Sequence, residues 1–187
     1  MSRKIIIALS LVLLSAATLP ASAGNIKLKQ TGWLNGAGGS QTGIGNKIDM
    51  DQWGALNNGV AKQVGLFNKQ RLKQKGLAND SFTKQTGKFN HSEMEQDGAF
   101  NQGVAIQTGK DNLSLIGQSG ENNYGETNQT GNHNEAGVGQ FGSNHTAVVS
   151  QDGSGNVTAG VQFGNGCAAD VEQNGAGNVA AFVQTCP

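Results

Sequence analysis

Few side chains in this sequence could perform acid–base or metal chemistry, and they do not converge. His91, His133 and His145 fall at three different positions of the repeating pattern described below, so they do not predict a metal site. Glu93 and Glu95 form an acid pair, but no pocket is implied around them, and no Ser-His-Asp or phosphate-loop pattern occurs. We therefore expect no enzymatic activity, no metal site and no cofactor.

The chemistry that does recur is hydrogen bonding by side-chain amides. A Gln-x-Gly motif begins at Gln30 and returns every eleven residues through fourteen copies, after which Gln184 keeps the phase while Cys186 replaces the glycine. The glutamines are Gln30, Gln41, Gln52, Gln63, Gln74, Gln85, Gln96, Gln107, Gln118, Gln129, Gln140, Gln151, Gln162, Gln173 and Gln184. The glycines, which suit a turn that needs positive φ, are Gly32, Gly43, Gly54, Gly65, Gly76, Gly87, Gly98, Gly109, Gly120, Gly131, Gly142, Gly153, Gly164 and Gly175.

An asparagine follows most of these glutamines after five residues. The asparagines are Asn35, Asn46, Asn57, Asn68, Asn79, Asn90, Asn101, Asn112, Asn123, Asn134, Asn156 and Asn178. His145 and Cys167 take this place in the two remaining units. Identical amides stacked above one another can bond along an axis. A buried amide is costly unless it is paired, so such a ladder tolerates few interruptions.

The composition does not suit an ordinary compact domain. Glycine supplies 29 of the 187 residues, aromatic residues make up 5%, and the formal net charge is zero. So little apolar volume is typical either of disorder or of a repeat architecture, and a fixed period separates the two. Because the phase is kept through fourteen units, the sequence predicts a repeat protein. No nucleic-acid partner is expected.

The first residues have the layout of a cleavable secretory signal. Two basic residues precede an apolar run over residues 5–14, and an Ala-Ser-Ala sequence ends at Ala23. A membrane anchor is the weaker alternative, because a bilayer-spanning helix needs roughly 20 apolar residues. We expect residues 1–23 to be a signal peptide that is removed and residues 24–187 to form one repeat domain, with no integral membrane segment after cleavage.

The alternation of residue types along each unit predicts a strand with one buried face and one solvent-exposed face. The asparagine, a small residue two positions later, an apolar residue four positions later and the next glutamine all point to the same side of an extended strand. No Asp, Glu, Lys or Arg occupies these positions, whereas the alternate face carries charges such as Asp49, Arg71 and Glu93. An eleven-residue helical supercoil is disfavoured, because a glycine in every unit costs about 1 kcal/mol relative to alanine. Each unit therefore reads as a strand followed by a tight turn.

Charge pairing indicates how many strands make one turn of the coil. With two strands per rung, residues twenty-two apart stack, so that Arg71 lies between Asp49 and Glu93, whereas a three-strand coil would place Asp49 against Phe82. The same spacing gives a second charged column (Asp51, Lys73, Glu95) and an apolar column (Val60, Phe82, Val104). The predicted fold is all-β: a two-sheet β-solenoid of 11-residue strand-turn units, with about two strands per 22-residue rung and seven rungs, each rising roughly 4.8 Å.

Cys167 and Cys186 are the only cysteines of a chain that we expect to be exported. In the two-strand coil Cys186 stacks on Gly164, three residues before Cys167, so a disulfide that closes the last rung is sterically possible. Two free thiols are the alternative. The pair is too small for a zinc site, and no histidine lies near it in the sequence.

The repeats predict a chain that adds further copies to its ends. They begin almost at the expected cleavage site and continue to the last residues, so we expect no capping element. A solenoid without caps presents unpaired backbone groups that can pair with another copy. Every Lys and Arg lies at or before Lys110, and only acids follow, which favours head-to-tail docking. Drift of charge in solvated loops explains this asymmetry equally well.

At these residues the sequence resembles the curlin family. The shared pattern is Gln-x-Gly-x-x-Asn-x-small-x-apolar-x-Gln, and it covers essentially all of residues 24–187. The resemblance implies a secreted structural subunit of curli, the amyloid fibre on the bacterial cell surface that supports cell adhesion and the biofilm matrix. The partners that it implies are further copies of the chain, other curlin-type subunits or a nucleator, and a dedicated outer-membrane secretion pore.

Two features depart from the family's pattern. The eleven-residue phase is unbroken, with no targeting segment evident before the first repeat, and the two cysteines are present. Major subunit and nucleator are therefore both open. The alternative from another class is a monomeric ligand- or ice-binding β-solenoid, which needs a regular outer array of one small polar residue. The outer positions here mix Lys, Arg, Glu, Phe and Val, which argues against that alternative.

Overall fold

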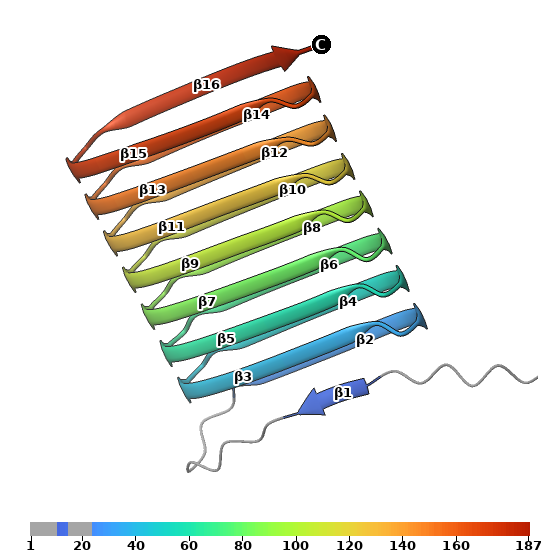
Figure 1. Ribbon diagram of the computed structural model, residues 1–187. Coiled ribbons are helices and arrows are strands. Elements are labelled where there is room, and N and C mark those ends of the chain that lie inside the picture. Colours follow the sequence, from blue (N-terminus) through green and yellow to red (C-terminus); the bar gives the residue numbers. More distant parts are fainter. Residues whose placement is uncertain (1–10, 15–23) are drawn as a thin grey trace, which may run out of the picture.

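The structure, a computed structural model, describes residues 11–14 and 24–187 as two parallel β-sheets that one chain builds by coiling (Figure 1). Among these residues, no helix is long and apolar enough to cross a membrane. Most of the predicted signal peptide, residues 1–23, lies outside the described residues. Its one described strand, β1 (Leu11–Leu14), pairs with β3 of the coil.

Successive strands alternate between the two sheets, which we call the odd sheet and the even sheet after the strand numbers. The odd sheet contains β1, β3 (Gly36–Ile44), β5 (Asn58–Leu66), β7 (Asp80–Lys88), β9 (Gln102–Lys110), β11 (Tyr124–Asn132), β13 (Thr146–Ser154) and β15 (Ala168–Ala176). The even sheet contains β2 (Asn25–Trp33), β4 (Lys47–Ala55), β6 (Lys69–Leu77), β8 (His91–Ala99), β10 (Leu113–Glu121), β12 (Glu135–Ser143), β14 (Val157–Asn165) and β16 (Val179–Cys186).

The register between neighbouring strands of the coil is twenty-two residues, which confirms the predicted two-strand rung. Gln63 lies opposite Gln85 in the odd sheet, and the even sheet repeats this offset. The predicted column of Asp49, Arg71 and Glu93 is present in the even sheet, as is the apolar column in the odd sheet. Strands β2 to β15 form seven rungs, and β16 begins an eighth.

Two backbone features produce each corner between strands. The glycines of the Gln-x-Gly motif have φ between +97° and +129°, as the sequence predicts. All of these glycines except Gly175 also lie directly against the next rung: a Cβ on Gly87 would stand 1.9 Å from the carbonyl oxygen of Gly109. The motif therefore needs glycine both for its backbone conformation and for the spacing of the rungs.

The interior is a thin slab in which hydrocarbon and amide alternate. One apolar cluster extends over the first five rungs and includes Ile48, Met50 and Met94, and a second cluster is centred on Val138 and Val149. Seven of the twelve largest fully buried side chains are glutamines. Hydrocarbon burial alone therefore cannot account for the cohesion of this core, and paired amides must supply much of it.

We expect Gly87→Ala to destabilise the solenoid by about 3 kcal/mol or more, because it combines backbone strain with a clash against the next rung. Gly117→Ala is the matched control, since its added methyl group would meet nothing within 4 Å and its φ is not positive. It should change stability by less than about 0.5 kcal/mol. Urea unfolding of freshly prepared, unassembled protein measures both, and equal effects would contradict the stacking argument.

Candidate functional site

The glutamines form two continuous hydrogen-bonded columns, one inside each sheet. In the even sheet, Gln74 Nε2 donates to Gln96 Oε1 at 2.9 Å, and Gln96 Nε2 donates to Gln118 Oε1 at 2.9 Å. The second N–H of Gln96 donates to the carbonyl of Asp80 across the slab. Each interior glutamine thus pairs its acceptor and both donors, and the column has a direction: every amide donates toward the C-terminal end.

The two columns contain all fifteen predicted glutamines. The even sheet holds Gln30, Gln52, Gln74, Gln96, Gln118, Gln140, Gln162 and Gln184, and the odd sheet holds Gln41, Gln63, Gln85, Gln107, Gln129, Gln151 and Gln173. The bonds within these columns measure 2.7 to 3.0 Å from Gln30 to Gln184 and from Gln41 to Gln173.

The asparagines form two further columns at the corners, and these donate in the opposite direction. Asn79 donates from its backbone N and from Nδ2 to Asn57 Oδ1, at 3.1 and 3.0 Å. Its Nδ2 also donates to the carbonyl of Gly98, nineteen residues later in the next rung. One asparagine therefore ties three successive rungs together. One corner stacks Asn35, Asn57, Asn79, Asn101 and Asn123, and the other stacks Asn46, Asn68, Asn90, Asn112, Asn134, Asn156 and Asn178.

The outer face of the even sheet carries the predicted ion pairs. Arg71 contacts Glu93 at 3.1 Å, and Lys73 contacts Glu95 at 2.8 Å. The hydrogen bond and the negative charge of each glutamate raise the pKa of its cationic partner. Exposed pairs of this kind add little stability individually. Their charges alternate in sign along the axis, however, so a shift in the register of one strand against the next would separate opposite charges and destabilise the sheet.

Two titratable side chains on the strands have shifted pKa values without forming a catalytic group. Burial lowers the pKa of His91, assisted by the charge of Lys69. Burial raises the pKa of Tyr124 to about 12, assisted by its hydrogen bond to Glu126. Over residues 11–14 and 24–187, His, Cys, Asp and Glu side chains do not gather in threes that could hold a metal ion.

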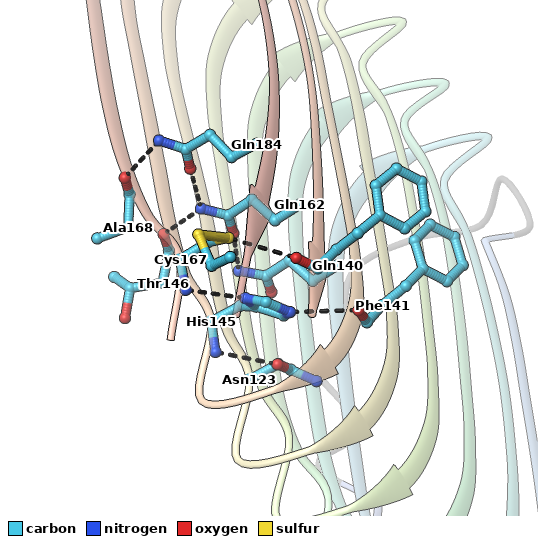
Figure 2. The surroundings of a disulfide bond; sticks show 11 residues. Asn123, Gln140, Phe141, His145, Thr146, Gln162, Cys167, Ala168 and Gln184 are labelled. Carbon is cyan, nitrogen blue, oxygen red and sulfur yellow. Dashed lines mark hydrogen bonds between the residues drawn. A yellow bond between two sulfur atoms is a disulfide. The ribbon is translucent and has the colours of Figure 1, made fainter. Parts of the chain in front are cut away.

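His145 takes the place of an asparagine in its corner column (Figure 2). Its backbone N donates to Asn123 Oδ1 at 3.1 Å, and its Nδ1 accepts the backbone N–H of Cys167 at 3.2 Å. Because Nδ1 accepts, the ring proton lies on Nε2, which donates to the carbonyl of Phe141. The imidazole thus keeps the acceptor of the column and the bond to the carbonyl four residues earlier, but it forms no bond to Gly164 like the Asn-to-Gly bonds of the other rungs.

Cys167 follows His145 in this column and forms a disulfide with Cys186 (Figure 2). The two cysteines are nineteen residues apart, with Cα atoms 5.6 Å from each other. Nineteen is also the separation between each corner asparagine and the glycine carbonyl to which it donates, as in Asn57 and Gly76. The covalent bond therefore stands where the other rungs have the Asn-to-Gly hydrogen bond.

The columns are unsatisfied at their ends. The buried Oε1 of Gln30 has no hydrogen-bond partner among the described residues. Inward side chains of the end strands, such as Leu28, Val171 and Phe182, are only partly buried, whereas Met50 and Val149 in the middle are fully buried. The two ends of the coil thus leave unpaired or only partly covered the groups that the middle pairs and covers.

Sequence reasoning missed one position, the residue four after each glutamine. It adopts the left-handed conformation even when it is not glycine, as in Phe67 (φ +55°) and Phe89 (φ +59°), whose exposed rings stack 5.4 Å apart. A left-handed residue with a side chain costs roughly 1–2 kcal/mol. The only available signal was the glycine at this position in four units, namely Gly45, Gly155, Gly166 and Gly177.

Comparison with known proteins agrees with this geometry over part of the chain. Residues 120–153, which extend from the end of β10 to the end of β13, match the family model described as curlin associated repeat. This match supports the curlin family. No curated protein and no solved structure matches the chain. The matched curlin repeats share their amide columns and corner glycines with the repeats before and after them.

We expect Gln85→Leu to destabilise the coil strongly. It leaves one N–H of Gln63 Nε2 and the Oε1 of Gln107 without partners, and each buried unpaired group costs about 1–3 kcal/mol. Lys84→Leu, which changes the neighbouring exposed side chain, is the control and should shift stability by less than about 0.5 kcal/mol. Urea unfolding midpoints measure the difference. Similar midpoints for the two variants would show that the amide column contributes little.

We expect reduction of the disulfide to loosen β16 and to leave the other strands unchanged. Closing a nineteen-residue loop contributes about 3 kcal/mol. The double variant Cys167→Asn with Cys186→Gly restores the hydrogen-bonded corner of the other rungs and should keep β16 protected with or without a reductant. Amide hydrogen exchange of residues 179–186 is the measurement. Protection of wild-type β16 that survives full reduction would contradict this expectation.

Proposed function

We propose that the chain is the structural subunit of an extracellular amyloid fibre of the curli type, which grows when copies stack end to end. The observation that carries the proposal is the open end of each amide column, above all the unpartnered Oε1 of Gln30. A further copy would supply the missing donor. The match to curlin associated repeats supports the same function.

The end strands support growth along the axis. Strands β2, β15 and β16 are edge strands among the described residues. Their outward backbone groups are the kind of edge to which another chain pairs. The internal strands pair with parallel strands that carry glutamine at the same register. A strand of this kind therefore fits an edge of the coil. A copy of this chain is the partner that matches at every position.

We infer that residues 1–23 are a signal peptide and that the chain is exported to the bacterial surface. The apolar run and the Ala-Ser-Ala sequence support this. Its removal would also remove β1 and free the edge of β3. Curlin-type subunits or a nucleator, and an outer-membrane pore, are the further partners that we propose. Adhesion and biofilm matrix are the roles that such a fibre would serve.

The test is fibre formation by the chain recovered after export, with its N-terminus determined by mass spectrometry. X-ray diffraction of aligned material should give a meridional reflection near 4.7–4.8 Å and an equatorial one near 10 Å. Dye-binding kinetics should show a lag that preformed seeds remove. A protein that stays monomeric and folded for days would contradict the proposal and favour the monomeric ligand-binding solenoid.

A further inference from the structure

Successive eleven-residue units occupy equivalent positions, although they lie in opposite sheets. Gln52 of the even sheet donates to a backbone carbonyl sixteen residues earlier, and Gln63 of the odd sheet does the same. The Asn-to-Gly bond spans nineteen residues at both corners, as the bonds of Asn57 and Asn68 show. Each unit is therefore related to the next by the same half turn and rise. The position that follows β16 lies on β15, in the odd sheet.

We propose that each incoming copy docks after a half turn about the solenoid axis, so that its β2 pairs with β15 and its β3 pairs with β16 of the preceding copy. The inference rests on the proposed end-to-end growth and adds its register. Strands β2 to β16 are fifteen in number, and an odd number of units requires the even sheet of one copy to continue the odd sheet of the other.

The outer charges of β2 and β15 complement each other in this register. Aligned by their glutamines, Lys27 of the incoming copy stands on Asp170, and Lys29 stands on Glu172. Among the described residues, neither Asp170 nor Glu172 forms an ion pair. The column of alternating charges on the even sheet of the incoming copy therefore continues by one more rung, onto the acids of the preceding copy.

Within its own chain, each of these two lysines already has an acid on one side. Lys27 approaches Asp49 at 4.0 Å, and Lys29 approaches Asp51 at 3.8 Å, on the side away from the junction. Both lysine side chains are more than half exposed. Docking places a second acid on their free side, so that each lysine lies between two carboxylates.

The amide columns fit the same register. Gln173 Nε2, at the C-terminal end of the odd-sheet column, uses one N–H on the carbonyl of Val157 and has the other for a further rung. The unpartnered Oε1 of Gln30 in the incoming copy is the acceptor that it meets. In a head-to-head contact two donor ends or two acceptor ends would face each other, so the columns permit head-to-tail stacking alone.

The inward apolar side chains also match in size across the junction. Leu28 of the incoming copy stands on Val171, and both are partly buried until they are covered. In the other sheet the ring of Phe182 lies over Gly160 of its own chain and under Gly39 of the incoming copy. A large side chain between two glycines fills space that neither glycine fills.

Docking without the half turn offers none of the charge pairing. In that arrangement Lys27 stands on Ala181 and Lys29 stands on Val183, while the acids of β15 have no strand opposite them. It also leaves one strand position of the odd sheet empty, with backbone groups unpaired on both sides. The half-turn register is thus favoured by charge and by backbone pairing.

Charge reversal at one end at a time tests the register. The first variant carries Lys27→Glu with Lys29→Glu, and the second carries Asp170→Lys with Glu172→Lys. Alone, each presents like charges at every half-turn junction, so elongation of its own seeds at low salt should be at least about ten-fold slower than for the wild type. High salt should reduce the difference, because the Debye length is about 3 Å at 1 M.

An equimolar mixture of the two variants is the decisive measurement. One junction of the alternating copolymer has the wild-type pairing and the other has the same pairs reversed, so the mixture should elongate at a rate within a few-fold of the wild type. This rescue cannot come from folding defects, because each chain keeps its own substitutions. Lys62→Glu with Lys84→Glu, in the middle of the odd sheet, is the matched control and should leave elongation unchanged.

Two results would overturn the half-turn register: single-end variants that elongate at the wild-type rate, or slow variants that the mixture does not rescue. Failure of the wild-type chain to form fibres is a separate outcome. It would overturn the proposed function as well, whereas the first two leave end-to-end growth standing.

Discussion

A buried side-chain amide must have its donors and its acceptor paired, and the rest of this structure depends on that requirement. The core has too little hydrocarbon to hold two sheets together, and glutamines are the commonest large side chains in it. Pairing them demands identical side chains at one constant spacing along the axis. The constant twenty-two-residue register, the parallel strands and the absence of charge on the inner face all follow from this demand.

The same requirement connects the fold to its proposed role. Glutamine columns donate toward one end and asparagine columns toward the other, so each end of the coil presents groups that only the opposite end of another copy can pair. A globular protein would bury or cap such groups. In the proposed fibre the unpaired groups are the binding site, and assembly continues folding from one chain to the next.

Departures from the repeat occur where the ladder ends. His145 keeps the backbone bond to the preceding asparagine and accepts from the next residue of the column, and the disulfide of Cys167 and Cys186 replaces the corner bond with a covalent one. Cys186 also stands where thirteen corners have a glycine pressed against the next rung. Unlike those glycines, Cys186 does not adopt a positive φ, so the backbone at this corner differs from that of the others.

The sequence by itself determined the period, the inner and outer faces, the two-strand rung and the alternating charges. Every unit repeats the same local choice, and an error in register would separate Asp49 and Arg71 from their oppositely charged neighbours. Only the tertiary structure decided the direction of the amide columns, the left-handed residue after each strand and the exchange of an Asn-to-Gly bond for a disulfide. These depend on where atoms of three successive rungs meet, and residue types alone do not specify which amide donates or which corner residue bears the strain.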